Sequence, residues 1–126
     1  MRPLDLLHIS IADQCLYGFT DGQLVVRLPV STALNGAGEQ SGSNCTPRGR
    51  HQVRAKIGDG LPEGAVLRGR RWTGEVWSEA LDAQFPGRDW ILTRILWLSG
   101  CEPGRNRLGQ VDTFRRYIYL HGTPDN

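Results

Sequence analysis

The sequence has 126 residues, of which 39% are hydrophobic, and 15 basic and 13 acidic side chains leave a formal net charge of +2. This length predicts a single domain over residues 1–126 with its own core, and the balanced charge argues against a nucleic-acid partner. The apolar runs are too short to span a membrane, and the residues after Met1 show no signal peptide.

The remaining composition argues against metal and cofactor sites. The three cysteines form no Cys-x-x-Cys pair, so we expect neither a disulfide framework nor a metal site. No glycine-rich phosphate loop opens a helix, so we expect no cofactor. The 16 glycines and seven prolines predict many turns and few long helices.

The first third of the chain predicts an antiparallel meander. Hydrophobic and polar residues alternate over 6–11, and 15–20 and 23–31 also have the composition of strands. Asp21 and Gly22 form the pair that favours a type I′ turn, which predicts a hairpin between the second and third strands.

The middle of the chain predicts a long loop followed by short elements. Residues 32–49 are rich in Gly, Ser, Asn and Pro, as in a functional flap or a mobile connection. Strands are predicted at 50–57, 65–68 and 74–77, and one or two helical turns at 78–85.

Two strands are predicted in the last third. Residues 90–99 are apolar on both faces and rich in β-branched and aromatic side chains, which favours a central strand covered on both sides. The final strand is predicted at 114–121, and turn formers follow from Gly122 to Asn126. The fold prediction is therefore mainly β, a curled sandwich or barrel with long loops.

Two groups of polar side chains fit ordinary surface roles. We interpret Arg68, Arg70 and Arg71 as a solvated turn rather than a site for an anionic polymer. His8 fits the rim of the first strand.

The stretch Tyr117-Ile118-Tyr119-Leu120-His121-Gly122 carries the candidate chemistry. In a strand Tyr117, Tyr119 and His121 share one face, and Gly122 permits a close backbone approach beside the imidazole. His121 is thus a candidate general base, and the alternative is an ordinary histidine at a strand end. The two tyrosines either line an acyl pocket or pack as core aromatics.

Several features in order resemble the L,D-transpeptidase (YkuD-type) catalytic domain of bacterial peptidoglycan enzymes. They are the opening meander, the segment Thr46-Pro47-Arg48-Gly49, which looks like the family's T-P-x-G, and the strand that ends in His121-Gly122. The resemblance implies catalytic roles for His121 and Gly122 and substrate binding by Tyr119 and Thr46.

The family's S/T-H-G-C segment, which carries the nucleophilic cysteine, does not occur in the 126 residues. Cys15 fits a strand, whereas Cys45 and Cys101 fit loops, and Cys101 precedes His121 whereas the family's nucleophile follows it. We therefore expect a C-terminally incomplete domain that is inactive alone. Uncovered strand edges predict a marginal chain that dimerises or swaps strands.

The resemblance implies acyl transfer from a tetrapeptide stem, through a cysteine thioester, to an amine of a second stem. The implied partners are peptidoglycan stem peptides, and the implied location is the periplasm or cell envelope. Two alternatives remain: a peptidoglycan-binding module without catalysis, and a β-sheet interaction protein with an exposed edge.

Overall fold

The structure, a computed structural model, describes residues 3–124. These residues form mostly β-strands, with one short α-helix and two 3₁₀-helices, so the chain is mainly β as predicted. The chain divides into two compact units, Met1–Arg48 and Gly49–Asn126. The extent of the domain over 1–126 stays a prediction, and the predicted turn residues Asp125 and Asn126 lie outside the described residues.

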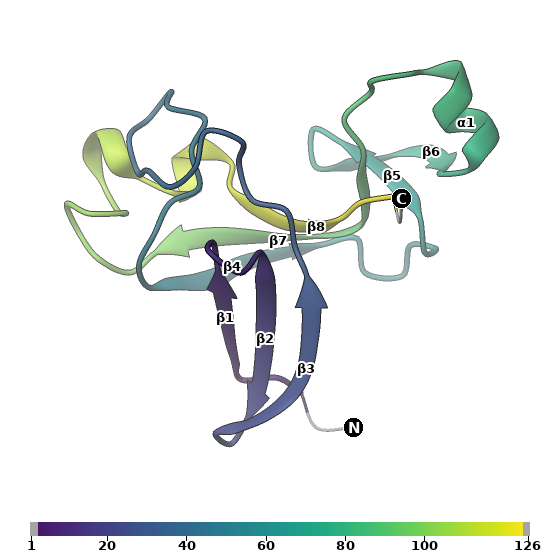
Figure 1. The fold of residues 1–126 in the computed structure, drawn as a ribbon. Helices are drawn as coiled ribbons and strands as arrows, with labels where there is room; N and C mark the ends of the chain where they lie inside the picture. Colours follow the sequence, from purple (N-terminus) through teal and green to yellow (C-terminus); the bar gives the residue numbers. More distant parts are fainter. Residues whose placement is uncertain (1–2, 125–126) are drawn as a thin grey trace. The chain divides into compact units, whose positions relative to one another are not determined.

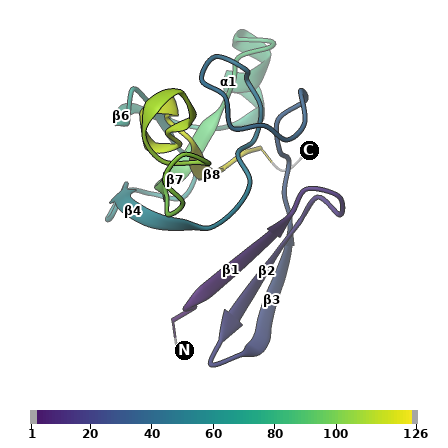
Figure 2. The same cartoon turned by 90° about the vertical axis from the view of Figure 1, so that its left-hand side faces the viewer.

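The first unit contains the predicted meander. The strands β1 (Leu6–Ser10), β2 (Cys15–Thr20) and β3 (Gln23–Pro29) lie side by side and pair antiparallel in that order (Figure 1; Figure 2). Asp21 and Gly22 have φ angles of 49° and 77°, which are the positive values that a type I′ turn requires. The hairpin prediction is confirmed.

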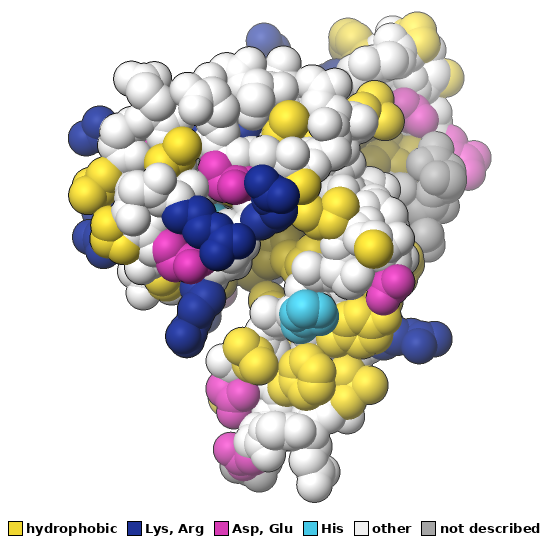
Figure 3. Space-filling model, turned by 60° about the vertical axis from the view of Figure 1, so that its left-hand side comes forward, with side chains coloured by type: hydrophobic (Ala, Val, Ile, Leu, Met, Phe, Trp, Pro, Cys, Tyr) yellow, Lys and Arg dark blue, Asp and Glu magenta, His cyan; other side chains and the backbone are white. Residues whose placement is uncertain are grey.

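The surface of this three-stranded sheet carries apolar side chains, as Figure 3 shows. Five large residues of the sheet and its flanks are between 42% and 59% exposed: Leu4, Leu6, Leu24, Val25 and Leu28. A buried core position is Leu16, at 8% exposure. Several apolar side chains of this sheet are therefore at least two-fifths exposed.

The second unit is organised around β7 (Ile91–Gly100). Its neighbours are β4 (His51–Ile57) and β5 (Ala65–Arg68), β5 also pairs with β6 (Arg71–Val76), and β8 (Tyr119–Gly122) runs along β7 (Figure 1). All of these pairs are antiparallel. The prediction of a central strand at 90–99 is therefore confirmed.

Only part of β7 is covered on both faces. Leu92 and Ile95 are buried at 5% and 1% exposure, but five of the ten strand residues have intermediate exposure between Thr93 and Leu98. Thr93 has a φ of 72°, which interrupts the extended backbone and shifts the register with β8. Thr93 and Arg94 are thus left out of the ladder with β8, as in a β-bulge.

The hydrophobic core of this unit lies where β5, β7 and the helix meet. Val66, Trp90 and Leu92 form its buried cluster, and Trp77 and Leu81 pack against it. Full burial of such side chains contributes about 1.5–3 kcal/mol each. The cluster therefore holds the start of β7 against β5 and the helix.

The helix α1 (Glu79–Gln84) confirms the prediction of a short helical segment at 78–85. The hydroxyl of Ser78 accepts a hydrogen bond from the backbone N–H of Leu81 at 3.0 Å, which is the usual N-cap contact. Asp82 accepts a hydrogen bond from the indole N–H of Trp90 at 3.0 Å. The cap and the indole contact fix the helix to the core.

The predicted final strand is wrong in its first half. Residues Phe114–Arg116 form the 3₁₀-helix η2, Tyr117 adopts a left-handed conformation with a φ of 56°, and β8 begins only at Tyr119. The carboxylate of Asp112 accepts the backbone N–H groups of Leu108 (2.7 Å) and Arg115 (3.0 Å) and so stabilises the turn. Tyr117 therefore does not share a strand face with Tyr119 and His121.

Candidate active site

The strand β8 holds three of the four predicted site residues. Its register places Tyr119 opposite Trp97, His121 opposite Ile95 and Gly122 opposite Leu92. Because β7 is the central strand of the unit, these pairings fix the positions of the β8 side chains on the sheet. The fourth residue, Thr46, belongs to the first compact unit.

The imidazole of His121 is exposed, and one of its nitrogens is engaged. Nδ1 lies 2.8 Å from the carbonyl oxygen of Gly122, and a carbonyl oxygen can only accept a hydrogen bond. Nδ1 must therefore carry the proton in this arrangement, which leaves Nε2 with its lone pair. No described residue bonds to Nε2, so His121 presents an exposed proton acceptor.

The backbone of β8 approaches β7 closely at Gly122. A Cβ atom on Gly122 would lie 2.7 Å from the carbonyl oxygen of Leu92 and 3.5 Å from the hydroxyl of Thr93. Any side chain at this position would push the two strands apart. Gly122 thus keeps His121 in register and supplies the carbonyl that orients the ring.

Tyr119 is embedded in a cluster of aromatic and guanidinium groups. Its ring meets Trp97 edge to face, with the centroids 5.7 Å apart, and its hydroxyl accepts a hydrogen bond from Arg70 at 3.3 Å. The guanidinium of Arg70 lies 5.1 Å from the ring centroids of both Trp97 and Tyr117. The hydrogen bond to Tyr119 raises the pKa of Arg70, and electrostatic interactions with Tyr119 and Tyr117 raise it further, against a lowering effect of burial.

These contacts correct the interpretation of the arginine-rich turn. Gly69 and Arg70 form the hairpin turn between β5 and β6, with φ angles of 56° and 65°. Arg70 is only partly exposed, because its guanidinium lies over aromatic rings, whereas Arg68 and Arg71 are exposed as predicted.

Thr46 organises the long loop of the first unit. Its hydroxyl accepts the backbone N–H of Ala33 at 2.8 Å, and its own N–H donates to the carbonyl of Gly36 at 2.9 Å. Thr46 also forms an isolated parallel bridge with Ala37. The contacts within this unit give Thr46 a loop-ordering role, and its assignment to substrate binding stays a prediction.

A second histidine of the unit has a different environment. Nδ1 of His51 lies 3.1 Å from the carbonyl oxygen of Gly49, and Nε2 lies 2.9 Å from the hydroxyl of Thr113. Nδ1 must donate to the carbonyl, so Nε2 accepts the hydroxyl hydrogen. Thr113 is completely buried, and both nitrogens of His51 are therefore occupied in a structural contact.

A polar network that the sequence did not reveal lies beside His51. The side chain of Asn106, which is fully buried, donates to the carbonyl of Arg50 at 3.0 Å and accepts the N–H of Glu102 at 2.9 Å. The carboxylate of Glu102 accepts the N–H of Arg50 at 2.8 Å. This backbone N–H, followed by the charges of Arg105 and Arg50, lowers the pKa of Glu102 despite some burial.

The cysteine positions agree with the sequence interpretation. Cys15 lies in β2, whereas Cys45 and the exposed Cys101 lie outside strands and helices. Cys101 is six residues beyond Ile95, the β7 partner of His121, which corresponds to about 20 Å along an extended strand. Cys101 is thus too far along the sheet for proton transfer to His121.

Residues 3–124 contain neither a candidate metal site nor a helix that could span a membrane. Within that range no three His, Cys, Asp or Glu side chains are grouped so as to hold a metal ion. The same residues contain no helix of the length and hydropathy needed to cross a membrane.

Comparison with known proteins completes the description of the site. No curated protein and no solved structure matches the chain. The family model of the L,D-transpeptidase catalytic domain (YkuD) matches residues 5–126, which is nearly the whole sequence. The chain belongs to the L,D-transpeptidase (YkuD) catalytic-domain family.

Proposed function

We propose that this domain serves peptidoglycan L,D-transpeptidation and that His121 is its general base. The observation that carries the proposal is the state of the imidazole: Nδ1 is held by the carbonyl of Gly122 at 2.8 Å, and the ring is exposed. A histidine oriented through one nitrogen and open at the other is suited to accept a proton. The contrast with His51, whose two nitrogens are both bonded, favours His121 within this unit.

The proposed reaction is acyl transfer in two steps. Nε2 of His121 takes the proton of a cysteine thiol, and the thiolate attacks the carbonyl carbon between the third residue of a tetrapeptide stem and D-alanine. The carbon–nitrogen bond breaks, D-alanine leaves with the proton from the imidazolium, and a thioester remains. An amine of a second stem then attacks the thioester and gives up a proton to Nε2 of His121, the carbon–sulfur bond breaks, and the thiolate leaves.

The thiol must come from a segment of the S-H-G-C type. Cys101 lies too far along β7 from the partner of His121, and the 126 residues contain no such segment. We therefore propose that these residues supply the base and the substrate-binding sheet and have no transpeptidase activity by themselves. Because the substrate is peptidoglycan, we also propose that the domain acts in the cell envelope.

The test compares the 126-residue chain with a longer polypeptide, the full-length protein, in which a segment of the S-H-G-C type follows the same residues. Each is incubated with a tetrapeptide stem and an acceptor stem, and D-alanine release and the cross-linked product are measured by mass spectrometry. In the full-length protein His121→Asn should lower the rate by about 10²- to 10⁴-fold, whereas His8→Asn, at an exposed position of β1, should leave it unchanged.

The 126-residue chain should release no D-alanine and form no cysteine adduct with a carbapenem. An adduct on Cys45 or Cys101 would contradict the proposal that the thiol lies elsewhere. Unaltered turnover in His121→Asn would remove His121 from the mechanism. Stem binding without turnover in the full-length protein would support the binding module instead.

A further inference from the structure

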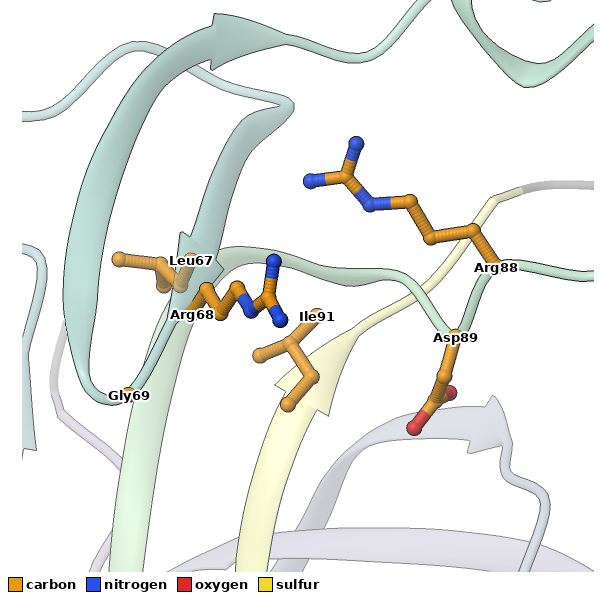
Figure 4. A pocket seen from close by; sticks show the side chains of 6 residues that line it. All are labelled: Leu67, Arg68, Gly69, Arg88, Asp89 and Ile91. Carbon is orange, nitrogen blue, oxygen red and sulfur yellow. The ribbon is translucent and has the colours of Figure 1, made fainter. Parts of the chain in front are cut away.

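A cavity of about 380 Å³ opens at one end of the sheet of the second unit. Its walls come from the end of β5, the turn after it, and the segment that leads into β7 (Figure 4). Six residues line it: Leu67, Arg68, Gly69, Arg88, Asp89 and Ile91. The volume lies within the range of small-molecule sites, which is about 300–1,000 Å³.

The strand pairing places this cavity near the end of β8. Leu92 pairs with Val66 of β5 and with Gly122 of β8, so the three residues form one row across the sheet. Ile91, which lines the cavity, is the next residue of β7, and it pairs with Leu67. The cavity therefore begins one residue beyond the row that contains Gly122, on the side of that row away from His121.

The guanidinium of Arg88 is already fixed and its charge is compensated. It forms an ion pair with Glu75 at 2.8 Å, and its central carbon lies 4.4 Å from the ring centroid of Trp90 and 5.2 Å from that of Phe85. Hydrogen bonds from Arg88 and then from Thr73 lower the pKa of Glu75, so the pair stays charged. Arg88 thus contributes a rigid wall rather than a free positive charge.

Arg68 and Asp89, unlike Arg88, carry charges that no described neighbouring side chain compensates. Both line the cavity and both are exposed, and the side chain of neither forms a hydrogen bond or an ion pair with any residue from 3 to 124. They are also not paired with each other. The cavity therefore contains one uncompensated positive charge and one uncompensated negative charge on separate walls.

We propose that this cavity binds the zwitterionic head group of an α-amino acid, with the carboxylate on Arg68 and the ammonium on Asp89. A ligand with only negative charge would be repelled by Asp89, and one with only positive charge by Arg68. A head group that carries both charges on one carbon satisfies both walls, and a guanidinium can bind a carboxylate through two parallel hydrogen bonds. The apolar side chains of Leu67 and Ile91 can contact the rest of the ligand.

Two sources present this head group: a free amino acid, and a peptide side chain that ends in an α-amino-acid group. Ile91 is four residues from Ile95, the partner of His121, which corresponds to about 13 Å along an extended strand. A peptide bound at His121 can span this distance, so the head group can belong to a substrate of that base. This assignment to a substrate rests on the proposed transpeptidase function. The binding of the head group itself does not depend on it.

The test is a binding titration of the ¹⁵N-labelled 126-residue chain followed by NMR. The first probe is D-alanine, and the matched probes are D-alaninamide, which lacks the carboxylate, and D-lactate, which lacks the ammonium. D-Alanine should shift the amide signals of Gly69 and Ile91 with a dissociation constant on the order of 1 mM, as expected for exposed charges. The matched probes should bind at least about fivefold more weakly.

Charge-removing variants with matched controls locate the two contacts. Arg68→Gln and Asp89→Asn should each weaken D-alanine binding by about fivefold or more. Two control variants each remove one charge of the same sign outside the cavity: Arg71→Gln in the same hairpin and Asp59→Asn in an exposed loop. Neither should change the affinity for D-alanine. Unchanged spectra away from the cavity show that each variant is folded.

Two peptides distinguish the sources. One has a side chain that ends in a free α-amino-acid group, and the other has the carboxylate of that group amidated. Tighter binding of the free form than of D-alanine supports a peptide-borne head group, and equal binding supports the free amino acid.

The inference is overturned if D-alaninamide binds as tightly as D-alanine, if Arg68→Gln binds normally, or if D-alanine leaves Gly69 and Ile91 unshifted up to its solubility limit. The titration involves no thiol chemistry, so its result is independent of D-alanine release by the full-length protein. Binding without release removes only the transpeptidase proposal.

Discussion

Arg70 donates a hydrogen bond to the hydroxyl of Tyr119 across 3.3 Å and so joins the β5–β6 turn to the strand that carries the predicted base. The same guanidinium lies over Trp97 and Tyr117. The strands β6 and β8 are not adjacent in the sheet, because β5 and β7 lie between them. One side chain therefore connects two elements that backbone hydrogen bonds leave apart.

Arg70→Ala should loosen this connection. We expect faster hydrogen exchange at the amides of Arg71 and Trp72 and a changed environment of the Tyr119 ring, both measured by NMR. Arg70→Lys should have an intermediate effect, because it keeps the charge but loses the planar stacking surface. Arg71→Ala is the matched control, and an equal effect of both alanine variants would contradict the special role of Arg70.

The neutral imidazole of His121 should be the Nδ1–H tautomer. The carbonyl of Gly122 at 2.8 Å requires a proton on Nδ1. Long-range ¹H–¹⁵N correlation spectra distinguish the two tautomers directly. His51 should show the same tautomer because of Gly49, and a dominant Nε2–H form of His121 would remove the proposed free acceptor.

Gly122→Ala should destabilise the junction of β7 and β8. Its Cβ would lie 2.7 Å from the carbonyl oxygen of Leu92, and relief of such crowding costs about 1–3 kcal/mol of unfolding free energy. Urea denaturation measures the loss, and the chemical shifts of His121 report the displacement of the ring. Thr123→Ala, at the exposed next residue, should change neither quantity.

Asn106→Ala should be among the most destabilising polar substitutions. It leaves the N–H of Glu102 without its partner, whereas the carbonyl of Arg50 keeps the N–H of Cys101 at 2.9 Å. The loss of one partly buried hydrogen bond corresponds to about 1–3 kcal/mol. Denaturant unfolding of the 126-residue chain gives the value. Gln110→Ala, on the exposed helix η1 (Gly109–Val111), should stay within about 0.5 kcal/mol of the parent.

Glu102 should make stability depend on pH in the acid range. The N–H of Arg50 lowers the folded-state pKa of Glu102 below its ordinary value. The unfolded chain therefore takes up the proton first, and the stabilisation is complete above the unfolded-state pKa and is lost as the pH falls through the folded-state pKa.

Glu102→Gln should remove this dependence. The variant should have a lower Tm than the parent at neutral pH. The difference between the two Tm values should become smaller as the pH falls. Glu63→Gln, at an exposed position, is the control and should keep the pH profile of the parent. If the Tm of the parent and that of Glu102→Gln fall equally as the pH is lowered, proton uptake by Glu102 is not coupled to unfolding.

The sequence determined the elements whose causes are local. The Asp21-Gly22 turn needs two residues that tolerate positive φ, and Ser78 caps the helix that follows it. The apolar composition of 90–99 also identified the central strand correctly. The family could be recognised because its segments occur in order along the chain.

Local pattern failed where a distant residue decides the conformation. Phe114 and Tyr117 have the composition of a strand, but the ring of Phe114 stacks on Trp97 with the centroids 4.0 Å apart, and its carbonyl accepts the indole N–H of Trp97, 17 positions away. The Asn106 network likewise joins residues that are 56 positions apart. No periodicity within a short window contains these contacts.

For the candidate site, the sequence alone determined that β8 ends in a histidine followed by glycine. Only the tertiary structure decided that Gly122 contacts Leu92, that Nε2 of His121 is open while that of His51 is bonded, and that Arg68 and Asp89 line one cavity without pairing. The physical reason is that a side chain's type sets which bonds it can form. The packing of distant segments sets which of those bonds are already satisfied and which remain for a ligand.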